Sequence, residues 1–230
     1  MASSAVHYRV ELGAKSMKLA TLVDLVRSLP GVPLAVCVGA RDALDDAASA
    51  IVHATASDPS PPSVTCLHSD QTPGERARVL AAFRARTRPR GDDRARDPDP
   101  RAADAASSLE RSRTSALVVS DACLPVEAPL DLPLLVNLDP PRSRDLRARR
   151  AKATLESGGG DGAARGGRTP RRVVVDVVAA DDRDWDFRGG GGDSGDGGAG
   201  GAAHLDPRPP PVDLLAIVRE AWLGPEGERG

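Results

Sequence analysis

The stretch LHSDQTPGER, residues 67–76, gathers the side-chain types that bind metals or move protons. A histidine, an aspartate, a glutamate and an arginine fall within ten positions. A bound metal needs about three or four ligands, and His68 with Asp70 supplies only two. Glu75 has a structural explanation, because residues 72–75 (TPGE) form a helix start with a capping box. We therefore predict a strand-to-helix turn and a helix cap here, in preference to a metal or catalytic site.

Two glycine tracts, residues 157–168 and 188–203, suggest phosphate-binding loops at first sight. Such a loop needs a preceding strand, a Gly-x-x-x-x-Gly-Lys-Ser/Thr sequence and a following helix. Neither tract has these features, so both are predicted to be flexible linkers. The chain also has no Gly-x-Ser-x-Gly, His-Glu-x-x-His or paired Cys-x-x-Cys motif. Hydrolase and zinc-site chemistry therefore has no sequence support.

The composition excludes a strong global attraction to nucleic acid or membrane. Lys+Arg number 31 against 33 Asp+Glu, and aromatic residues make up only 2% of the chain. A core must therefore be built from Val, Leu, Ile and Ala. The three cysteines lack metal spacing, and their odd number indicates free thiols in a reducing compartment. No apolar run approaches the roughly 18 residues of a membrane span. We expect a cytoplasmic or nuclear protein that does not contact membranes.

Short apolar runs alternate with amphipathic segments along the chain. Strands are predicted at residues 6–12, 34–39, 63–67, 116–120, 134–139 and 171–179. Helices are predicted at residues 16–29, 41–55, 72–85 and 143–155. Continuous apolar strands separated by helices are typical of a parallel sheet that is covered on both faces. The fold class is therefore predicted to be α/β.

Other segments do not fit that sheet. Residues 84–115 consist mainly of Arg, Asp, Pro and Ala and cannot bury enough surface to offset their ordering entropy. We predict that they form a disordered insertion between two halves of one lobe. The chain is thus predicted to consist of five parts: the first half of the lobe at residues 1–83, the insertion 84–115, the second half of the lobe at residues 116–182, a Gly/Pro-rich linker 183–211 and a C-terminal helix 212–223.

Several stretches occur in an order that is typical of one known family. LAVCVGARDALD resembles its motif IV, and SVTCLHSDQTPGERARVLAAFRA resembles the stretch with its Gln-x-x-Arg motif. ALVVSDACLPVEAPLDLPLLVNLDPP follows its motif V and the next strand, and VVVDVVAADD is similar to its last strand. From Val6 to about Asp182 the chain thus resembles the C-terminal RecA-like lobe of DEAD-box RNA helicases, in particular the translation-initiation subgroup. The resemblance implies a RecA-like parallel sheet.

The departures from the family pattern imply that the ATP site is lost. In the family, motif V reads Ala-Arg-Gly-x-Asp, and its aspartate binds the ATP ribose. The same positions of this chain read LPVEA. The two arginine fingers of motif VI align with Ala153 and Glu156. One finger is worth about a thousand-fold or more in rate, and a glutamate repels phosphate. Arg150 keeps a basic residue of the degenerate motif VI, so it is the one candidate for cofactor contact. We expect no bound cofactor, no metal and no catalytic residue.

The positions that contact RNA in the family are less completely changed. Arg41 keeps a basic residue in motif IV, and Arg76 keeps the arginine of Gln-x-x-Arg, although Pro73 replaces the glutamine. Ser120 and Asp121 stand at the start of motif V. These four candidates imply a salt-dependent affinity for single-stranded RNA.

Three functional hypotheses follow from the sequence. The first is a non-catalytic helicase C-lobe that binds single-stranded RNA or a translation or RNA-processing partner, such as a scaffold protein. The second is an ATP-dependent RNA helicase subunit that a separate first lobe completes in trans. The third is a gene product without a selected activity. Loss of the finger arginines favours the first hypothesis over the second.

Overall fold

A seven-stranded sheet, with every pair of neighbouring strands parallel, forms the centre of the molecule. The computed structural model describes residues 5–87, 113–156, 172–182 and 203–205. The strands lie in the order β3-β4-β2-β5-β6-β1-β7. Their bounds are β1 Val6–Leu12, β2 Leu34–Val38, β3 Ser63–Leu67, β4 Ser115–Ser120, β5 Leu134–Asn137, β6 Val173–Ala179 and β7 Ala203–Leu205.

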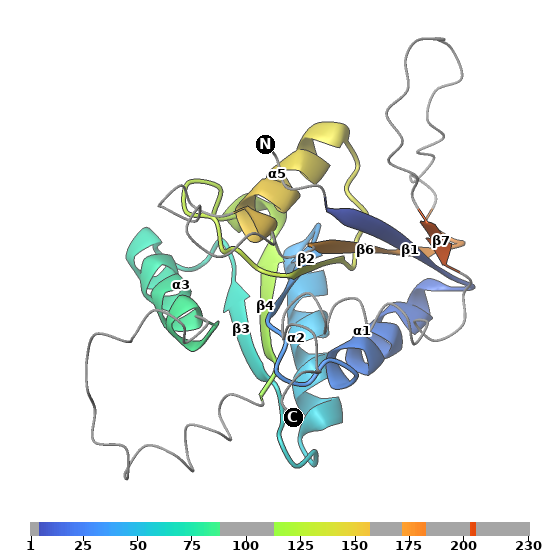
Figure 1. Ribbon diagram of the computed structural model, residues 1–230, viewed down its shortest axis with the longest axis horizontal. Coiled ribbons are helices and arrows are strands. Elements are labelled where there is room, and N and C mark those ends of the chain that lie inside the picture. Colours follow the sequence, from blue (N-terminus) through green and yellow to red (C-terminus); the bar gives the residue numbers. More distant parts are fainter. Residues whose placement is uncertain (1–4, 88–112, 157–171, 183–202, 206–230) are drawn as a thin grey trace, which may run out of the picture.

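Helices cover both faces of this sheet (Figure 1). Their bounds are α1 Lys18–Arg27, α2 Arg41–Thr55, α3 Pro73–Thr87 and α5 Arg144–Leu155, with short 3-10 turns η1 at Lys15–Met17 and η2 at Asp121–Cys123. The buried residues of α1 and α2 join one core cluster, and those of α3 and α5 join a second cluster across the sheet. In the described part of the chain, no helix is long and apolar enough to cross a bilayer.

Burial along the strands explains why the chain forms a parallel sheet. Every residue of β2, β4, β5 and β6 is buried, so these strands are covered on both faces. Continuous Val- and Leu-rich runs suit that environment, whereas an alternating run suits a sheet with one exposed face. The predicted α/β parallel sheet is therefore confirmed.

Most predicted elements are present, with small shifts at their ends. The strands 6–12 and 63–67 and the helix 41–55 have the predicted bounds. The first helix is shorter than predicted, because a 3-10 turn precedes it. Strand β5 ends at Asn137, so Leu138 and Asp139 lie beyond the sheet and line a cavity at its edge.

Two predicted segment boundaries differ in the structure. Helix α3 continues to Thr87, where the Thr87 hydroxyl donates to the carbonyl of Phe83 at 3.1 Å. It therefore extends into the segment 84–115 that we predicted to be disordered, and β4 begins at the other end of that segment. Strand β7 falls within the predicted linker 183–211 and pairs with Tyr8–Val10 of β1. The predicted C-terminal helix 212–223 lies outside the described residues.

Candidate functional site

The carboxyl ends of the parallel strands bring the candidate residues to one edge of the sheet. Strand β2 is followed by α2 on one face, and its neighbour β5 is followed by α5 on the opposite face. Ligands of open α/β sheets bind at such a switch point, outside the carboxyl ends of the strands. A cavity of about 590 Å³ lies there, lined by residues that follow β1, β2, β4, β5 and β6.

Arg150 is the most enclosed charged side chain at this edge, with 1% of its surface exposed. Its Nε and Nη2 donate to the two carboxylate oxygens of Asp121 at 2.6 and 2.8 Å. Its Nη1 donates to Oδ1 of Asn137 at 2.9 Å and to the carbonyl of Asp139 at 2.6 Å. Burial alone lowers the pKa of Arg150, but the hydrogen bond to Asp121 and the surrounding negative charges, Asp139 among them, together outweigh it and raise that pKa. Arg150 therefore stays charged and ties α5 to the ends of β4 and β5.

This cluster continues through the sheet by way of Asn137, which is fully buried. The Asn137 side-chain amide donates to Oδ1 of Asp176 at 2.6 Å, and Arg147 pairs with Oδ2 of the same aspartate at 3.1 Å. Cys37 is also fully buried, and this burial raises the pKa of its thiol to about 12. Such a thiol is protonated at neutral pH, so Cys37 is not a nucleophile.

A second polar cluster closes the other side of the cavity. Nζ of Lys18 donates to the carbonyl of Leu138 at 3.0 Å and pairs with Oδ2 of Asp182 at 2.7 Å. Burial raises the pKa of Asp182, but the hydrogen bonds from Lys18 and from the Ala179 amide and the charge of Lys18 together outweigh it, so the pKa lies below its usual range. The Gly39 backbone amide donates to Oδ2 of Asp139 at 2.9 Å, which joins the ends of β2 and β5.

The four predicted RNA-binding residues and Arg150 occupy different surroundings. An ion pair joins Asp121, which was predicted to bind RNA, to Arg150, which was predicted to contact a cofactor. Ser120 is buried at the end of β4. Arg41 pairs with Asp45 at 2.6 Å and with Asp70 at 3.3 Å. Arg41 thus has two carboxylate partners, and the ATP contact predicted for Arg150 stays untested.

Arg76 lies in the first turn of α3, where its Nη1 donates to the carbonyl of Gln71 at 2.6 Å. Arg41 contacts the same turn, residues 68–71, through Asp70. The structure therefore brings both predicted residues into contact with one turn at the carboxyl edge.

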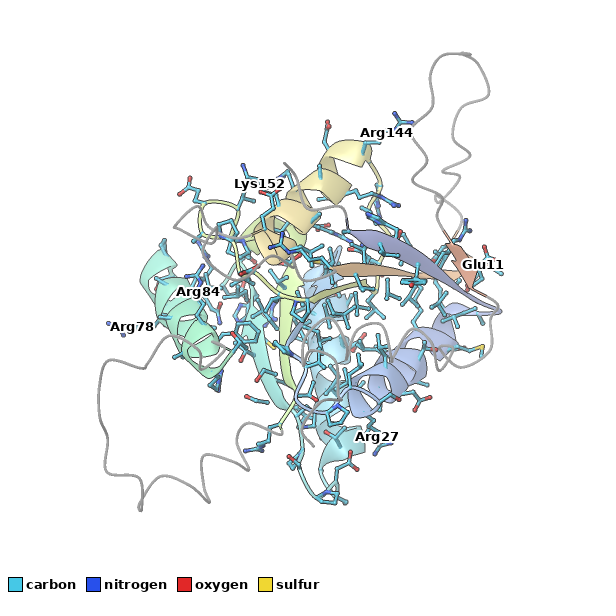
Figure 2. All side chains as sticks on the ribbon, in the orientation of Figure 1. Glu11, Arg27, Arg78, Arg84, Arg144 and Lys152 are labelled. Atoms are coloured by element: carbon cyan, nitrogen blue, oxygen red, sulfur yellow. The ribbon has the colours of Figure 1, made fainter. Side chains whose placement is uncertain are left out.

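Helix α3 carries a group of arginines that have no carboxylate partner among the described residues. It contains Arg76, Arg78, Arg84 and Arg86 with a single acid, which gives a formal charge of +3. Arg84 donates to the carbonyl of Ala128, and Arg86 donates to the hydroxyl of Thr65. Within the described ranges, none of the four arginines pairs with a carboxylate. Figure 2 shows Arg78 on the outer side of the helix. The sequence alone did not single out Arg78.

The opening turn of α3 has the predicted capping box. The Thr72 amide donates to Oε2 of Glu75 at 2.7 Å, and the Glu75 amide donates to Oγ1 of Thr72 at 3.3 Å. The strand-to-helix turn predicted for residues 67–76 is thus confirmed. Across the described ranges, no three metal-binding side chains lie together.

The capping box predicts a pH dependence of stability. The hydrogen bond from the Thr72 amide holds the pKa of Glu75 below its ordinary value of 4.5. A lowered pKa in the folded state contributes stability that is present above the ordinary value and is lost as the pH falls through the lowered one. We expect Glu75→Gln to lower the urea midpoint at neutral pH and to have a smaller effect in acid. A difference between the two proteins that does not change with pH would contradict this assignment.

Comparisons with known structures identify the fold. The C-terminal domain of S. cerevisiae Dbp5 bound to Gle1 and IP6 matches with a TM-score of 0.54 and 13% identity, over 96% of this chain and 99% of that domain. A longer S. cerevisiae Dbp5 structure bound to Gle1 and IP6 matches with a TM-score of 0.51 and 15% identity, over 79% of this chain. The predicted RecA-like fold of a DEAD-box C-terminal domain is therefore confirmed.

The chain spans about a third of the longer helicase structures that it matches. It covers 37% of that longer Dbp5 structure and 35% of Prp28 from Chaetomium thermophilum bound to ADP. The Prp28 match has 20% identity and a TM-score of 0.49, over 79% of this chain. No protein-family model matches the sequence, and no curated protein has a significant match to it.

Proposed function

We propose that this chain is a non-catalytic helicase C-lobe module that binds the phosphates of single-stranded RNA through α3. The observation that carries the proposal is the charge of +3 on α3, whose arginines have no carboxylate partner among the described residues. Elsewhere, Arg27, Arg41, Arg147, Arg150 and Arg172 each pair with an aspartate. Helix α5 has a formal charge of +4, but its Arg147 and Arg150 pair with Asp176 and Asp121, so α3 is the better candidate to bind a polyanion.

Within α3, the first turn lies nearest to the edge of the sheet that the carboxyl ends of the strands form. Arg76 is held there by the Gln71 carbonyl, and Arg78 follows two positions later with an exposed side chain. The carbonyl keeps the guanidinium of Arg76 in place without removing its charge. Arg41 contributes less, because a phosphate would have to displace Asp70 from it.

RNA recognition by this surface depends on phosphates more than on bases. The Tyr and Phe side chains of the described segments, Tyr8 and Phe83, are both buried. Base stacking therefore has no exposed Phe, Tyr or Trp ring in the described segments, and stacking is the contact that keeps its strength in salt. The module should bind different single-stranded sequences with similar affinity and release them as the salt concentration rises.

The surroundings of α5 support the absence of catalysis. Ala153 is fully buried, and Glu156 is exposed at the other position where the family has a finger arginine. Four N–H groups of Arg150 are directed at protein oxygens. ATP turnover by an isolated DEAD-box first lobe is therefore expected to stay unchanged when this chain is added. Membership of the translation-initiation subgroup and binding of a scaffold protein belong to the same proposal, on the sequence resemblance alone.

Replacing Arg76 and Arg78 by glutamine tests the RNA proposal. We expect the variant to lose affinity for a fluorescein-labelled oligouridine of about 12 nucleotides, measured by anisotropy at about 50 and 200 mM salt. Each phosphate contact contributes about 0.7 to the slope of log affinity against log salt for single strands. The double substitution should therefore reduce that slope by about 1.4.

The matched control is Arg149→Gln, which removes an exposed arginine of α5 and should leave affinity and slope unchanged. Equal losses in the control and the double variant would point to the overall charge and contradict a site on α3. Absence of binding at the lower salt concentration would reject RNA as the ligand and leave a protein partner as the next candidate.

A further inference from the structure

The cavity at the switch point holds two charged side chains that the fold does not use. Among the charged residues that line it, Lys18 pairs with Asp182 and Arg150 pairs with Asp121. Arg142 and Asp46 also line the cavity, and in the described part of the chain neither has a hydrogen bond or an ion pair. These two side chains therefore remain available to a ligand.

The two available charges come from different elements that line the cavity. Asp46 lies on α2 beside Ala43, three positions earlier on the same helix face and also in the lining. Arg142 lies in the loop between β5 and α5 and also lines the cavity. A ligand in the cavity therefore meets a carboxylate from α2 and a guanidinium from the loop before α5.

The total charge of the lining disfavours a polyanion. Four basic residues and four acidic residues line the cavity, so their formal charges cancel. A nucleoside triphosphate would face four carboxylates with no surplus of positive charge to offset them. A zwitterion, by contrast, presents one group for each available side chain and brings no net charge.

The remaining lining is apolar. Leu19, Leu138, Leu146 and Pro140 contribute to the walls. A volume of about 590 Å³ falls in the range of cavities that enclose small organic ligands. It has room for more than one apolar side chain.

We propose that this cavity binds a zwitterionic peptide of about two residues with apolar side chains. The terminal carboxylate accepts two parallel hydrogen bonds from the Arg142 guanidinium, which is the favoured geometry of that pair. The terminal ammonium donates to the Asp46 carboxylate, and the side chains pack against Leu19 and Leu146. The site uses neither α3 nor its arginines, so it is independent of RNA binding.

Titration of the ¹⁵N-labelled full-length chain with L-leucyl-L-leucine tests the proposal. We expect shifts of the amides of Gly39, Ala43 and Leu138, with saturation in the millimolar range. Dileucine amide lacks the carboxylate and N-acetyl-dileucine lacks the ammonium, and each should bind about tenfold or more weakly than the free dipeptide. Equal binding of all three compounds would overturn the proposal.

Substitutions of Arg142 and Asp46 provide a second test of the peptide site. Arg142→Gln and Asp46→Asn should each weaken dileucine binding about tenfold. The control for Arg142→Gln is Arg149→Gln, which removes an exposed charge from α5, the helix that follows Arg142. The control for Asp46→Asn is Asp42→Asn, which removes an exposed charge from the same helix α2. Both controls should leave binding unchanged. No amide shifts with dileucine, or equal losses in variants and controls, would reject the site. Oligouridine affinity of the Arg142 and Asp46 variants should stay at the level of the unmodified chain, which separates this result from the test of RNA binding.

Discussion

Replacing Arg150 with alanine is expected to lower the free energy of unfolding by about 3–5 kcal/mol. The substitution removes the bidentate partner of Asp121 and leaves the side-chain oxygen of Asn137 without its donor. Asn137 is fully buried in the intact protein. An uncompensated polar group in such a site costs more than the bond itself contributed. Urea denaturation followed by circular dichroism measures the change.

A double-mutant cycle with Asp121→Asn separates the ion pair from the general effect of truncation. If the pair dominates, the loss caused by Arg150→Ala should be smaller in the Asp121→Asn background. The exposed neighbour Arg149 serves as the matched control, and Arg149→Ala should stay within about 0.5 kcal/mol of the unmodified protein. A loss for Arg150→Ala of less than about 1 kcal/mol would show that the buried network contributes little to stability.

Replacing Phe83 with alanine is expected to cost about 3–5 kcal/mol. Phe83 is fully buried and is the one residue of α3 that is buried. It joins the core cluster that contains Leu67 of β3 and Leu117 of β4. Without the ring, α3 keeps only partly buried contacts through Val79 and Leu80, so the helix that carries the four arginines loses its anchor. Thermal and urea denaturation measure the loss.

The control for this substitution is Val52→Ala, which removes apolar atoms from a side chain that is 50% exposed. It should change the free energy of unfolding by about 0.5 kcal/mol or less. Comparable losses in the two variants would contradict the role of Phe83 as the anchor of α3.

Local patterns explain why much of the fold could be predicted. Strands β2 and β4 are continuous apolar runs, and α2 has apolar residues at helical spacing, so each is encoded within a few neighbouring positions. The capping box of α3 spans residues 72–75 and is equally local. Strand β7 has no comparable pattern, because a three-residue edge strand depends on pairing with β1 and not on its own sequence.

The site was harder to predict, because its contacts join distant residues. Asp121 and Arg150 were both identified, but their pairing depends on the order of β4, β2 and β5 in the sheet and is not visible in spacing. The resemblance singled out Arg41 and Arg76 as RNA-binding candidates but did not reveal that Arg41 is paired with Asp45 and Asp70.

That the arginines of α3 have no carboxylate partner within residues 5–87, 113–156, 172–182 and 203–205 is likewise a property of the folded chain. An arginine-rich segment in a composition with 33 acidic residues gives no indication of which arginines remain unneutralised. Only the positions of the acids around each guanidinium decide this, and they distinguish α3 from α5, where Arg147 and Arg150 pair with aspartates.

The most direct test of RNA binding by α3 is to locate the bound RNA on the protein. Oligouridine titrated into the ¹⁵N-labelled chain at low salt should shift the amides of Thr72, Arg76 and Arg78 and those of the turn at residues 68–71. The same titration at high salt should give smaller shifts, because phosphate contacts are screened. Shifts confined to α1 or α5, or no shifts at low salt, would contradict the assignment of α3 as an RNA-binding surface.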